Sequence, residues 1–303
     1  MSRLKKYMRE VLSDWQLYVL ILPAVAFLFI FAYIPMYGVQ IAFKEYQFKL
    51  GIWRSPWVGF EHFRRFLEYP QFWKIVKNTF VISLYSLATF PIGVIVAILL
   101  NELDNRHFKK TVQMVSYAPH FISTVVLCGM IMLFFGRSNG LVNNIIELFG
   151  GERVDFLTIP KYFASIYVWS GVWKDLGWST IIYLAALSGV SPELVEAARI
   201  DGATRLQVIR FVNIPTILPT IIIMLILSCG SILSVGFEKV FLLQNDLNKD
   251  ASQVISTYVY QIGLVSGQFS YSSAIGLFNT LVNVVCLLIV NEIAKRVSDV
   301  SIW

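Results

Sequence analysis

Two adjacent charged residues, Lys174 and Asp175, interrupt a long apolar stretch of the chain. A charged side chain at the centre of a membrane helix costs about 2.5–3.5 kcal/mol on insertion scales, so such residues usually face a cavity or a partner. Adjacent residues project in different directions from a helix, so these two need separate partners. They are candidates for the polar lining of a path through a membrane or for salt bridges to a neighbouring helix or subunit, and both alternatives stay open.

Three tryptophans surround this charged pair, namely Trp169, Trp173 and Trp178. Trp169 and Trp173 are four residues apart and therefore share a helix face. Aromatic faces stack on sugar rings, which would suit a carbohydrate path, whereas packing against lipid or other helices is the alternative. Asn279 and Asn283 share one face of a later apolar stretch. Their amides can bond sugar hydroxyls or join neighbouring helices.

No cluster of residues suited to catalysis or metal binding accompanies these candidates. The sequence contains no Gly-x4-Gly-Lys-[Ser/Thr] phosphate loop, no Gly-x-Ser-x-Gly and no His-Glu-x-x-His motif. Its histidines and cysteines are scattered without metal-ligand spacing, at His62, His107, His120, Cys128, Cys229 and Cys286. We therefore expect no catalytic residue, no metal site and no ATPase activity in this chain.

The segment 188–215, here called the elbow, has strong local helix signals. Ser191 can cap a first short helix that has Pro192 at its first position, and Gly202 suits the left-handed residue that ends it. Thr204 followed by Gln207 fits a capping box for a second helix. We expect two short helices joined by a turn, with Pro215 and Pro219 at the start of the next membrane helix. Either an ordinary interfacial loop or a loop that transmits force to a partner would fit this pattern.

The composition predicts an all-α polytopic membrane protein. Hydrophobic residues make up 56% and charged residues 15% of the 303 residues, and the mean hydropathy is +0.65. A soluble domain carries about a quarter charged residues. Six stretches reach the roughly 20 apolar residues that a membrane span needs, and they are Leu17–Ile41, Asn78–Leu100, Thr111–Phe135, Tyr162–Leu187, Thr216–Phe237 and Ser272–Ala294. We treat residues 1–303 as one membrane domain.

The net charge of +6 is carried mainly by short loops beside these stretches, which favours contact with anionic lipid over a nucleic acid partner. Six spans place both termini on one side of the membrane. Lysine and arginine number twelve on each side, so charge alone does not fix the orientation. A weakly apolar stretch at 254–264 is too short to span and is predicted to be re-entrant or interfacial.

The elbow resembles the EAA motif of ABC importer permeases, which reads Glu-Ala-Ala, Gly, then Ile-x-Leu-Pro. The matching residues are Glu196-Ala197-Ala198, then Gly202, then Val212-Asn213-Ile214-Pro215, in which Val212 and Ile214 replace Ile and Leu. In that family this loop is cytoplasmic and docks as a coupling helix on an ATPase subunit. The resemblance therefore implies that both termini are cytoplasmic. It also implies that coupling to the ATPase involves Glu196, Ala197, Ala198, Asp201, Gly202, Arg205 and Pro215.

Further stretches resemble the sugar-permease branch of the family, within the group of LplB and aldouronate-type oligosaccharide permeases. They are Leu22-Pro23 with Tyr33-Ile34-Pro35-Met36-Tyr37-Gly38, Trp57-Val58-Gly59-Phe60-Glu61-His62-Phe63, Phe237-Glu238-Lys239-Val240-Phe241-Leu242-Leu243, and Ile255-Ser256-Thr257-Tyr258-Val259-Tyr260. The resemblance implies the type I ABC importer permease fold and transport of an oligosaccharide by alternating access.

The same resemblance implies the partners. They are a second homologous permease subunit, a cytoplasmic ABC ATPase dimer that holds ATP and Mg²⁺, and an extracellular solute-binding lipoprotein, all at a bacterial plasma membrane. This chain itself needs no cofactor. The alternatives are an ABC permease for a non-sugar solute, which the binding protein's ligand would reveal, and an ATP-independent secondary carrier or channel. A membrane enzyme is disfavoured because catalytic clusters are absent.

Overall fold

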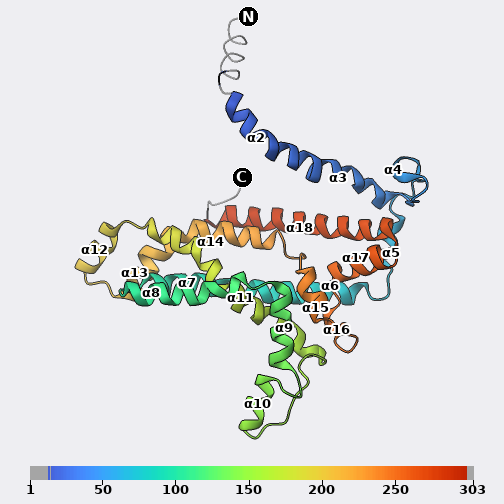
Figure 1. Cartoon of the computed structure of the whole chain (residues 1–303). Coiled ribbons are helices and arrows are strands. Elements are labelled where there is room, and N and C mark those ends of the chain that lie inside the picture. The colour runs from blue at the N-terminus through green and yellow to red at the C-terminus, as the bar shows by residue number, and fades with distance from the viewer. Residues whose placement is uncertain (1–12, 14, 299–303) are drawn as a thin grey trace, which may run out of the picture.

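The computed structural model describes residues 13 and 15–298, without the side chains of residues 297 and 298, and this part of the chain is mostly helical (Figure 1). Its only extended pairing is an isolated bridge between Lys44 and Trp57. The N-terminal segment 1–10, which contributes to the charge count, lies outside the described residues.

The helices follow the chain in groups that mostly match the predicted spans. The first span region comprises α2 (Trp15–Leu28), η1 (Phe29–Tyr33), α3 (Ile34–Met36) and η2 (Tyr37–Phe43), followed by α4 (Gly51–Arg54) and α5 (Glu61–Leu67). The middle comprises α6 (Phe72–Ala88), α7 (Phe90–Asn101), α8 (Arg106–Tyr117), η3 (Ala118–Phe121), α9 (Thr124–Phe135), α10 (Leu141–Leu148), α11 (Pro160–Ser188) and α12 (Pro192–Ile200). The remainder comprises α13 (Arg205–Val208), η4 (Ile209–Asn213), α14 (Ile214–Cys229), α15 (Phe237–Leu243), α16 (Lys249–Ser252), α17 (Ile255–Tyr260), η5 (Gln261–Val265) and α18 (Phe269–Ser298).

Six segments of the described chain have the length and apolarity of membrane spans. Four are continuous helices, at Trp15–Phe43, Phe72–Asn101, Arg205–Cys229 and Phe269–Arg296. Two more are bent helix pairs, Arg106–Phe121 with Thr124–Phe135 and Pro160–Ser188 with Pro192–Ile200. If each bent pair is counted as one span, the number agrees with the six expected.

The third predicted span, Thr111–Phe135, is wrong as a single helix. The chain bends by 100° between η3 and α9. Pro119 lies in η3 and has no backbone N–H with which to continue an α-helix, and Ile122 and Ser123 are extended. The Ser123 hydroxyl then accepts from Val126 N and caps α9 at its new direction. As a result α8 lies along the bundle while α9 projects away from it (Figure 1).

The fifth predicted span, Thr216–Phe237, begins too late and ends too late. The observed span runs from Arg205 to Cys229, so the second short helix of the elbow is continuous with it and is not a separate element. The π-helical turn η4 precedes Pro215, which has no backbone N–H, and the Ile214 N–H donates to the Ile209 carbonyl. Beyond Gly230 the chain turns, and Phe237 starts the separate helix α15.

Helix α11 occupies the centre of the body and contacts α6, α7, α8 and α14. Small residues allow its close packing. A Cβ on Gly177 would lie 2.2 Å from the Ser116 carbonyl oxygen of α8, and one on Gly93 of α7 would lie 2.7 Å from the Ser179 hydroxyl oxygen. Such contacts are typical of membrane helices, which associate through small residues that bring backbones together.

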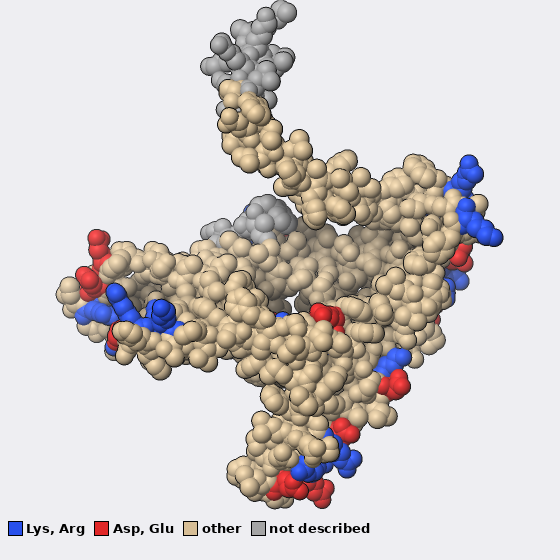
Figure 2. Space-filling model, in the orientation of Figure 1, with Lys and Arg blue, Asp and Glu red and all other residues tan. Residues whose placement is uncertain are grey.

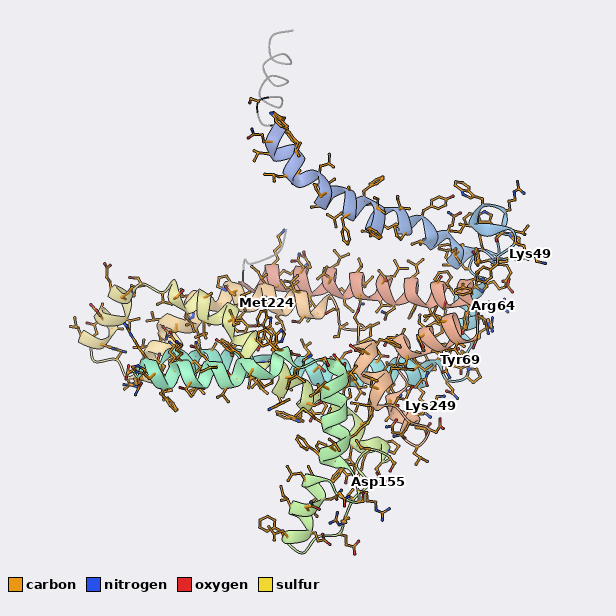
Figure 3. All side chains as sticks on the ribbon, in the orientation of Figure 1. Lys49, Arg64, Tyr69, Asp155, Met224 and Lys249 are labelled. Carbon is orange, nitrogen blue, oxygen red and sulfur yellow. The ribbon has the colours of Figure 1, made fainter. Side chains whose placement is uncertain are left out.

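The first span stands apart from this body (Figure 1). Its segment α2 contains no buried residue, and the span meets the rest of the chain through η2 against α18. Figure 2 shows charge gathered around α12 and along the opposite and lower margins, and the surface between them is mostly uncharged apart from a small acidic group near its middle. Lys49, Arg64 and Lys249 lie at the end of the body far from α12 (Figure 3). This distribution matches a belt of lipid around the apolar middle.

Candidate functional site

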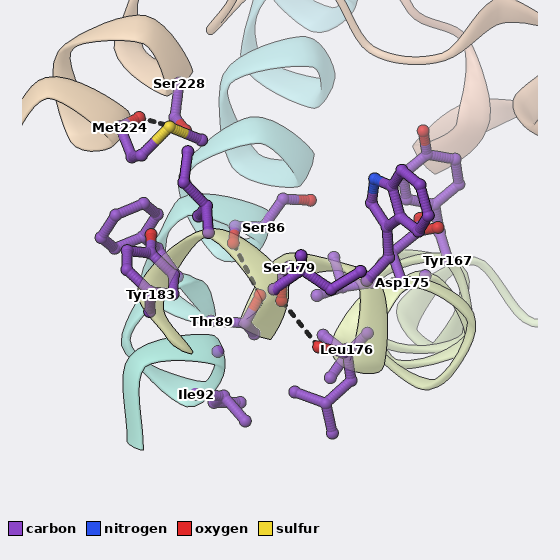
Figure 4. A pocket seen from close by; sticks show the side chains of 18 of the residues that line it. Ser86, Thr89, Ile92, Tyr167, Asp175, Leu176, Ser179, Tyr183, Met224 and Ser228 are labelled. Carbon is purple, nitrogen blue, oxygen red and sulfur yellow. Dashed lines mark hydrogen bonds between the residues drawn. The ribbon is translucent and has the colours of Figure 1, made fainter. Parts of the chain in front are cut away.

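A cavity of about 790 Å³ opens beside α11 in the middle of the helical body (Figure 4). Its walls come from α6, α7, α11, α14 and α15, which are segments far apart in the sequence. The lining is mainly apolar and also contains polar and aromatic side chains. The principal ones are Ser86, Thr89, Phe90, Tyr167, Asp175, Trp178, Ser179, Tyr183, Ser228 and Lys239. Cavities of this size and mixed lining are the usual form of small-molecule sites.

The hydroxyl groups of the cavity wall are held by their own helices. Ser179 donates to the Leu176 carbonyl at 2.8 Å, Thr89 donates to the Ser86 carbonyl at 2.7 Å, and Ser228 donates to the Met224 carbonyl at 2.8 Å (Figure 4). With its proton committed in this way, each hydroxyl oxygen keeps lone pairs for an incoming donor. The wall can therefore accept hydrogen bonds from ligand hydroxyls without a change in its own conformation.

A second cavity of about 370 Å³ continues from the first and shares Ser86, Phe90, Tyr167 and Ser228 with it. Serines are again prominent in its lining, at positions 83, 86, 228, 231 and 234. The two cavities form one region in which neutral hydroxyls alternate with aromatic rings. Rings bind the apolar faces of sugars and hydroxyls bind their edges, so the lining has the chemistry of a carbohydrate path.

Lys239 lines the larger cavity and is a residue that the sequence prediction missed. Its ammonium group donates to the Tyr167 carbonyl at 2.6 Å and lies 4.5 Å from the centre of the Tyr167 ring. The stretch Phe237–Leu243 entered the family resemblance, but the resemblance did not assign its lysine a role. The available sequence signal for this residue was a charged side chain just after the end of the predicted fifth span.

Asp175 lines the same cavity and belongs to a cluster at its edge. Its carboxylate meets the Nδ1 atom of His120 at 2.9 Å. The His120 ring stacks on Trp178, with 4.3 Å between ring centres and 3° between planes. His120 lies in η3, at the bend of the third span. The cluster therefore ties that bend to the central helix, and His120 is a second residue that sequence analysis did not select.

The other candidates on α11 point elsewhere. Trp169 and Trp173 line an apolar groove of about 510 Å³ between α9 and α11, and Trp169 donates to the Tyr85 hydroxyl at 2.8 Å. Lys174 lines none of the cavities described here, and it forms no ion pair within the described part of the chain. Of the five predicted residues on this helix, Asp175 and Trp178 thus face the cavity, while the role of all five in a path stays a prediction.

The two asparagines of α18 line neither cavity. Asn283 is buried, accepts from Leu233 N at 2.9 Å and donates to the Ser234 hydroxyl at 3.0 Å. It therefore fixes the chain that follows α14, in keeping with the helix-joining alternative. The Asn279 side-chain oxygen is buried and has no hydrogen-bond partner among the described residues.

The elbow has most of the predicted local structure. Gly202 has a φ of +82°, in the left-handed region that favours glycine. The Thr204 backbone N–H donates to the Gln207 side chain at 2.7 Å, and Gln207 N donates back to the Thr204 hydroxyl, which completes a capping box. The expected cap by Ser191 is wrong, because its side chain accepts no hydrogen bond from α12 and Pro192 alone marks that start.

Acidic residues of the loop between the second and third spans brace the elbow. Arg205 pairs with Asp104 at 3.1 Å, and the buried Asn213 side chain donates to Glu102 at 3.2 Å. Glu102 and Asp104 could not be predicted from the sequence as partners of the elbow, because they are more than 100 residues distant from Arg205 and Asn213. These contacts fix the junction of the elbow and the fifth span against the end of α7.

The free surface of the elbow is apolar as well as charged. Ile200, Leu206 and Phe211 are exposed, with Ile200 at 86%. The motif residues Glu196, Ala197 and Asp201 are also exposed, and Ala198 is half-buried. Apolar side chains presented beside charges at a rigid turn are typical of a surface that binds another protein.

The sequence profile of the "Binding-protein-dependent transport system inner membrane component" family matches residues 89–299. The chain belongs to this family. Among its relatives in Bacillus subtilis (strain 168), the polygalacturonan/rhamnogalacturonan transport system permease protein YteP is 41% identical over 300 residues, which cover 99% of this chain and 94% of YteP. Protein LplB of the same organism is 40% identical over 291 residues, which cover 96% and 92%.

Among solved structures, a chain of a bacterial ABC transporter involved in the import of the acidic polysaccharide alginate superposes with a TM-score of 0.89 and 39% identity, covering 97% of this chain and 99% of that one. A chain of the alginate transporter in complex with an alginate-pentasaccharide-bound periplasmic protein gives the same TM-score at 38% identity. The expected fold class, an all-α ABC importer permease, is confirmed. The protein is a multi-pass membrane subunit for transport and not an enzyme.

Proposed function

We propose that this chain is the permease subunit of an ATP-driven importer for an oligosaccharide. The observation that carries the proposal is the pair of adjoining cavities lined by serines and aromatic rings, in a fold shared over 97% of the chain with a transporter that imports the polysaccharide alginate. Serine hydroxyls that already donate to their own helix present acceptors to sugar hydroxyls.

The elbow supplies the link to an energy source. It docks on a separate ABC ATPase dimer, which binds ATP and Mg²⁺, and this chain needs no cofactor. Glu196, Ala197, Asp201 and Gly202 lie on the exposed turn that the ATPase would contact. With the ATPase docked there, the elbow side of the membrane and both termini would be cytoplasmic.

The connections of the elbow explain how a movement there reaches the cavity. Helix α12 follows α11 across a bend of 74°, and α13 runs without interruption into α14. Both α11 and α14 line the cavity, through Ser179 and Ser228 among others. Closure of the ATPase dimer therefore moves two cavity walls through rigid helices, which is the requirement for alternating access to one site.

Two further partners complete the transporter. A second, homologous permease subunit covers the first span, whose segment α2 contains no buried residue in this chain. A solute-binding lipoprotein delivers the oligosaccharide to the opposite side from the elbow. The crystal structure of the alginate transporter in complex with its loaded periplasmic protein supports the second of these partners by similarity.

Reconstitution of the complete complex in proteoliposomes tests the proposal. Uptake of an oligosaccharide should require ATP on the side of the membrane that carries the elbow, which is the vesicle lumen. It should also require the loaded binding protein on the opposite side. Uptake driven by an ion gradient without ATP would identify a secondary carrier instead. A binding protein that takes a peptide or ion but no oligosaccharide would place the chain with permeases for other solutes.

A further inference from the structure

Lys239 is the single lysine or arginine among the described residues that line the larger cavity. Its side chain is 9% exposed, and no carboxylate of the described chain lies within 4 Å of its ammonium group. Glu238, the preceding residue in the chain, is exposed and does not pair with it. A buried cation without an anionic partner is destabilising unless another contact compensates. Among the described residues, its direct compensating contacts are with the Tyr167 carbonyl and ring.

The surroundings hold this lysine in position. The Tyr167 hydroxyl accepts from Gly236 N at 3.1 Å, so the ring beneath Lys239 is fixed at both ends. On the facing helix, Gly171 leaves room for the ammonium group, because a Cβ there would lie 3.3 Å from Nζ. An ammonium group has three donors, of which the Tyr167 carbonyl takes one. The remaining donors are available to a ligand in the cavity.

The rest of the lining does not neutralise this charge. The hydroxyls are neutral, and the one carboxylate among the described lining residues, Asp175, is bonded to His120 at 2.9 Å. A ligand that carried both hydroxyls and a carboxylate would satisfy the serines and the lysine together. A neutral sugar would offer the ammonium group no anionic partner.

Resting on the proposed function, we propose that Lys239 is a specificity-determining residue that binds the carboxylate of a uronate ring, so that the transported oligosaccharide is acidic. The ammonium donates to the carboxylate while the serine hydroxyls accept from the ring hydroxyls. The solved alginate transporter, which imports an acidic polysaccharide, shares 39% of its residues with this chain.

The test compares uptake of an oligogalacturonate with uptake of its carboxyl-reduced, neutral counterpart by the complete complex in proteoliposomes. The measured quantity is the acidic-to-neutral uptake ratio of each variant relative to the unmodified complex, so the preference of the binding protein cancels. Lys239→Met should lower this ratio by about tenfold or more, because a hydrogen bond to a charged group is lost. ATPase co-purification should be unchanged, because Lys239 is distant from the elbow.

Two variants make the comparison decisive. Lys161 also lies over a tyrosine ring, at 4.7 Å from that of Tyr162, but lines no cavity described here, so Lys161→Met should leave the ratio unchanged. Lys239→Arg keeps the positive charge and should retain most of the acidic-to-neutral uptake ratio. If the Lys239→Met complex does not assemble, Lys239→Gln is compared with Lys239→Arg instead. An unaltered ratio in the neutral variants, or a preference of the unmodified complex for the neutral sugar, overturns this inference alone. Absence of any oligosaccharide uptake by the unmodified complex overturns the proposed function as well.

Discussion

The elbow and the cavity differ in how the chain builds them. The elbow is formed by consecutive residues whose capping bonds and left-handed glycine are local, and most of its side chains are exposed. The cavity is assembled from five helices, with lining residues from Ser86 to Lys239, and no single stretch of sequence contains it. Local hydrogen bonds therefore shape one region, and helix packing shapes the other.

This difference separates the two tasks of a permease. A partner protein must find the same elbow whatever the solute, so a self-contained turn suits it. A solute site can change by substitutions on several helices without altering that turn. Because α11 and α14 run from one region to the other, changes confined to the elbow should affect coupling, and changes confined to the cavity should affect uptake.

The largest expected effect is that of Gly202→Val. The left-handed conformation at a φ of +82° is strained for a β-branched residue, although a Cβ at this position would meet no atom within 4 Å. We expect insertion in the membrane to be retained and ATPase co-purification to fall by roughly tenfold or more, since the strain is about 1–2 kcal/mol and the turn must reshape to relieve it.

Gly150→Val is the matched control for this variant. Gly150 has a φ of +79° and open space around it, but it follows α10 and not the elbow. Its substitution should leave ATPase co-purification unchanged. Equal losses in both variants, or none in Gly202→Val, would show that the geometry of the elbow is not what the ATPase recognises.

A substitution that fills the cavity should produce the opposite pattern. Ser86 lines both cavities, and Ser86→Phe places a ring where they join. We expect oligosaccharide uptake to fall by about tenfold, while the ATPase still co-purifies, because a blocked site leaves the elbow intact. Thr280→Phe, at an exposed position on α18 that lines neither cavity, should transport normally. Loss of ATPase association in Ser86→Phe would mean that the two regions are not separable.

The sequence predicted the elbow better than the cavity for physical reasons. Capping chemistry depends on residues three apart, so Thr204 and Gln207 could be paired without a structure. Periodicity placed Trp169 and Trp173 on one face of their helix but could not tell which neighbour that face meets, and they line the apolar groove. Lys239 reaches the cavity only because the chain turns after Gly230, which apolarity alone did not reveal.

Asn213 tests how the two regions are connected, because it lies where the elbow joins the span that leads to the cavity. Asn213 is 3% exposed and its side chain donates to Glu102, so Asn213→Ala removes a partly buried hydrogen bond to a carboxylate. We expect a loss of about 1.5–3 kcal/mol in stability, measured as a lower midpoint of thermal unfolding. The ratio of ATP hydrolysed to sugar imported should rise, because movement of the elbow is transmitted less completely to the cavity.

Asn144→Ala, in α10, changes an exposed asparagine and provides the control. An unchanged ratio would remove Glu102 from the coupling path.

The smallest expected effect belongs to the exposed ion pair between Arg205 and Asp104, whose side chains are 67% and 82% exposed. Exposed pairs contribute about 0.2–1 kcal/mol, and salt screens them. A double-mutant cycle with Arg205→Ala and Asp104→Ala, read as stimulated ATPase activity, should give a coupling in this range that fades as ionic strength rises. If Arg205→Ala alone lowers the stimulated ATPase activity by far more than the coupling energy of the cycle, Arg205 acts mainly by contacting the ATPase. That result would move this residue from the internal brace to the docking surface of the elbow.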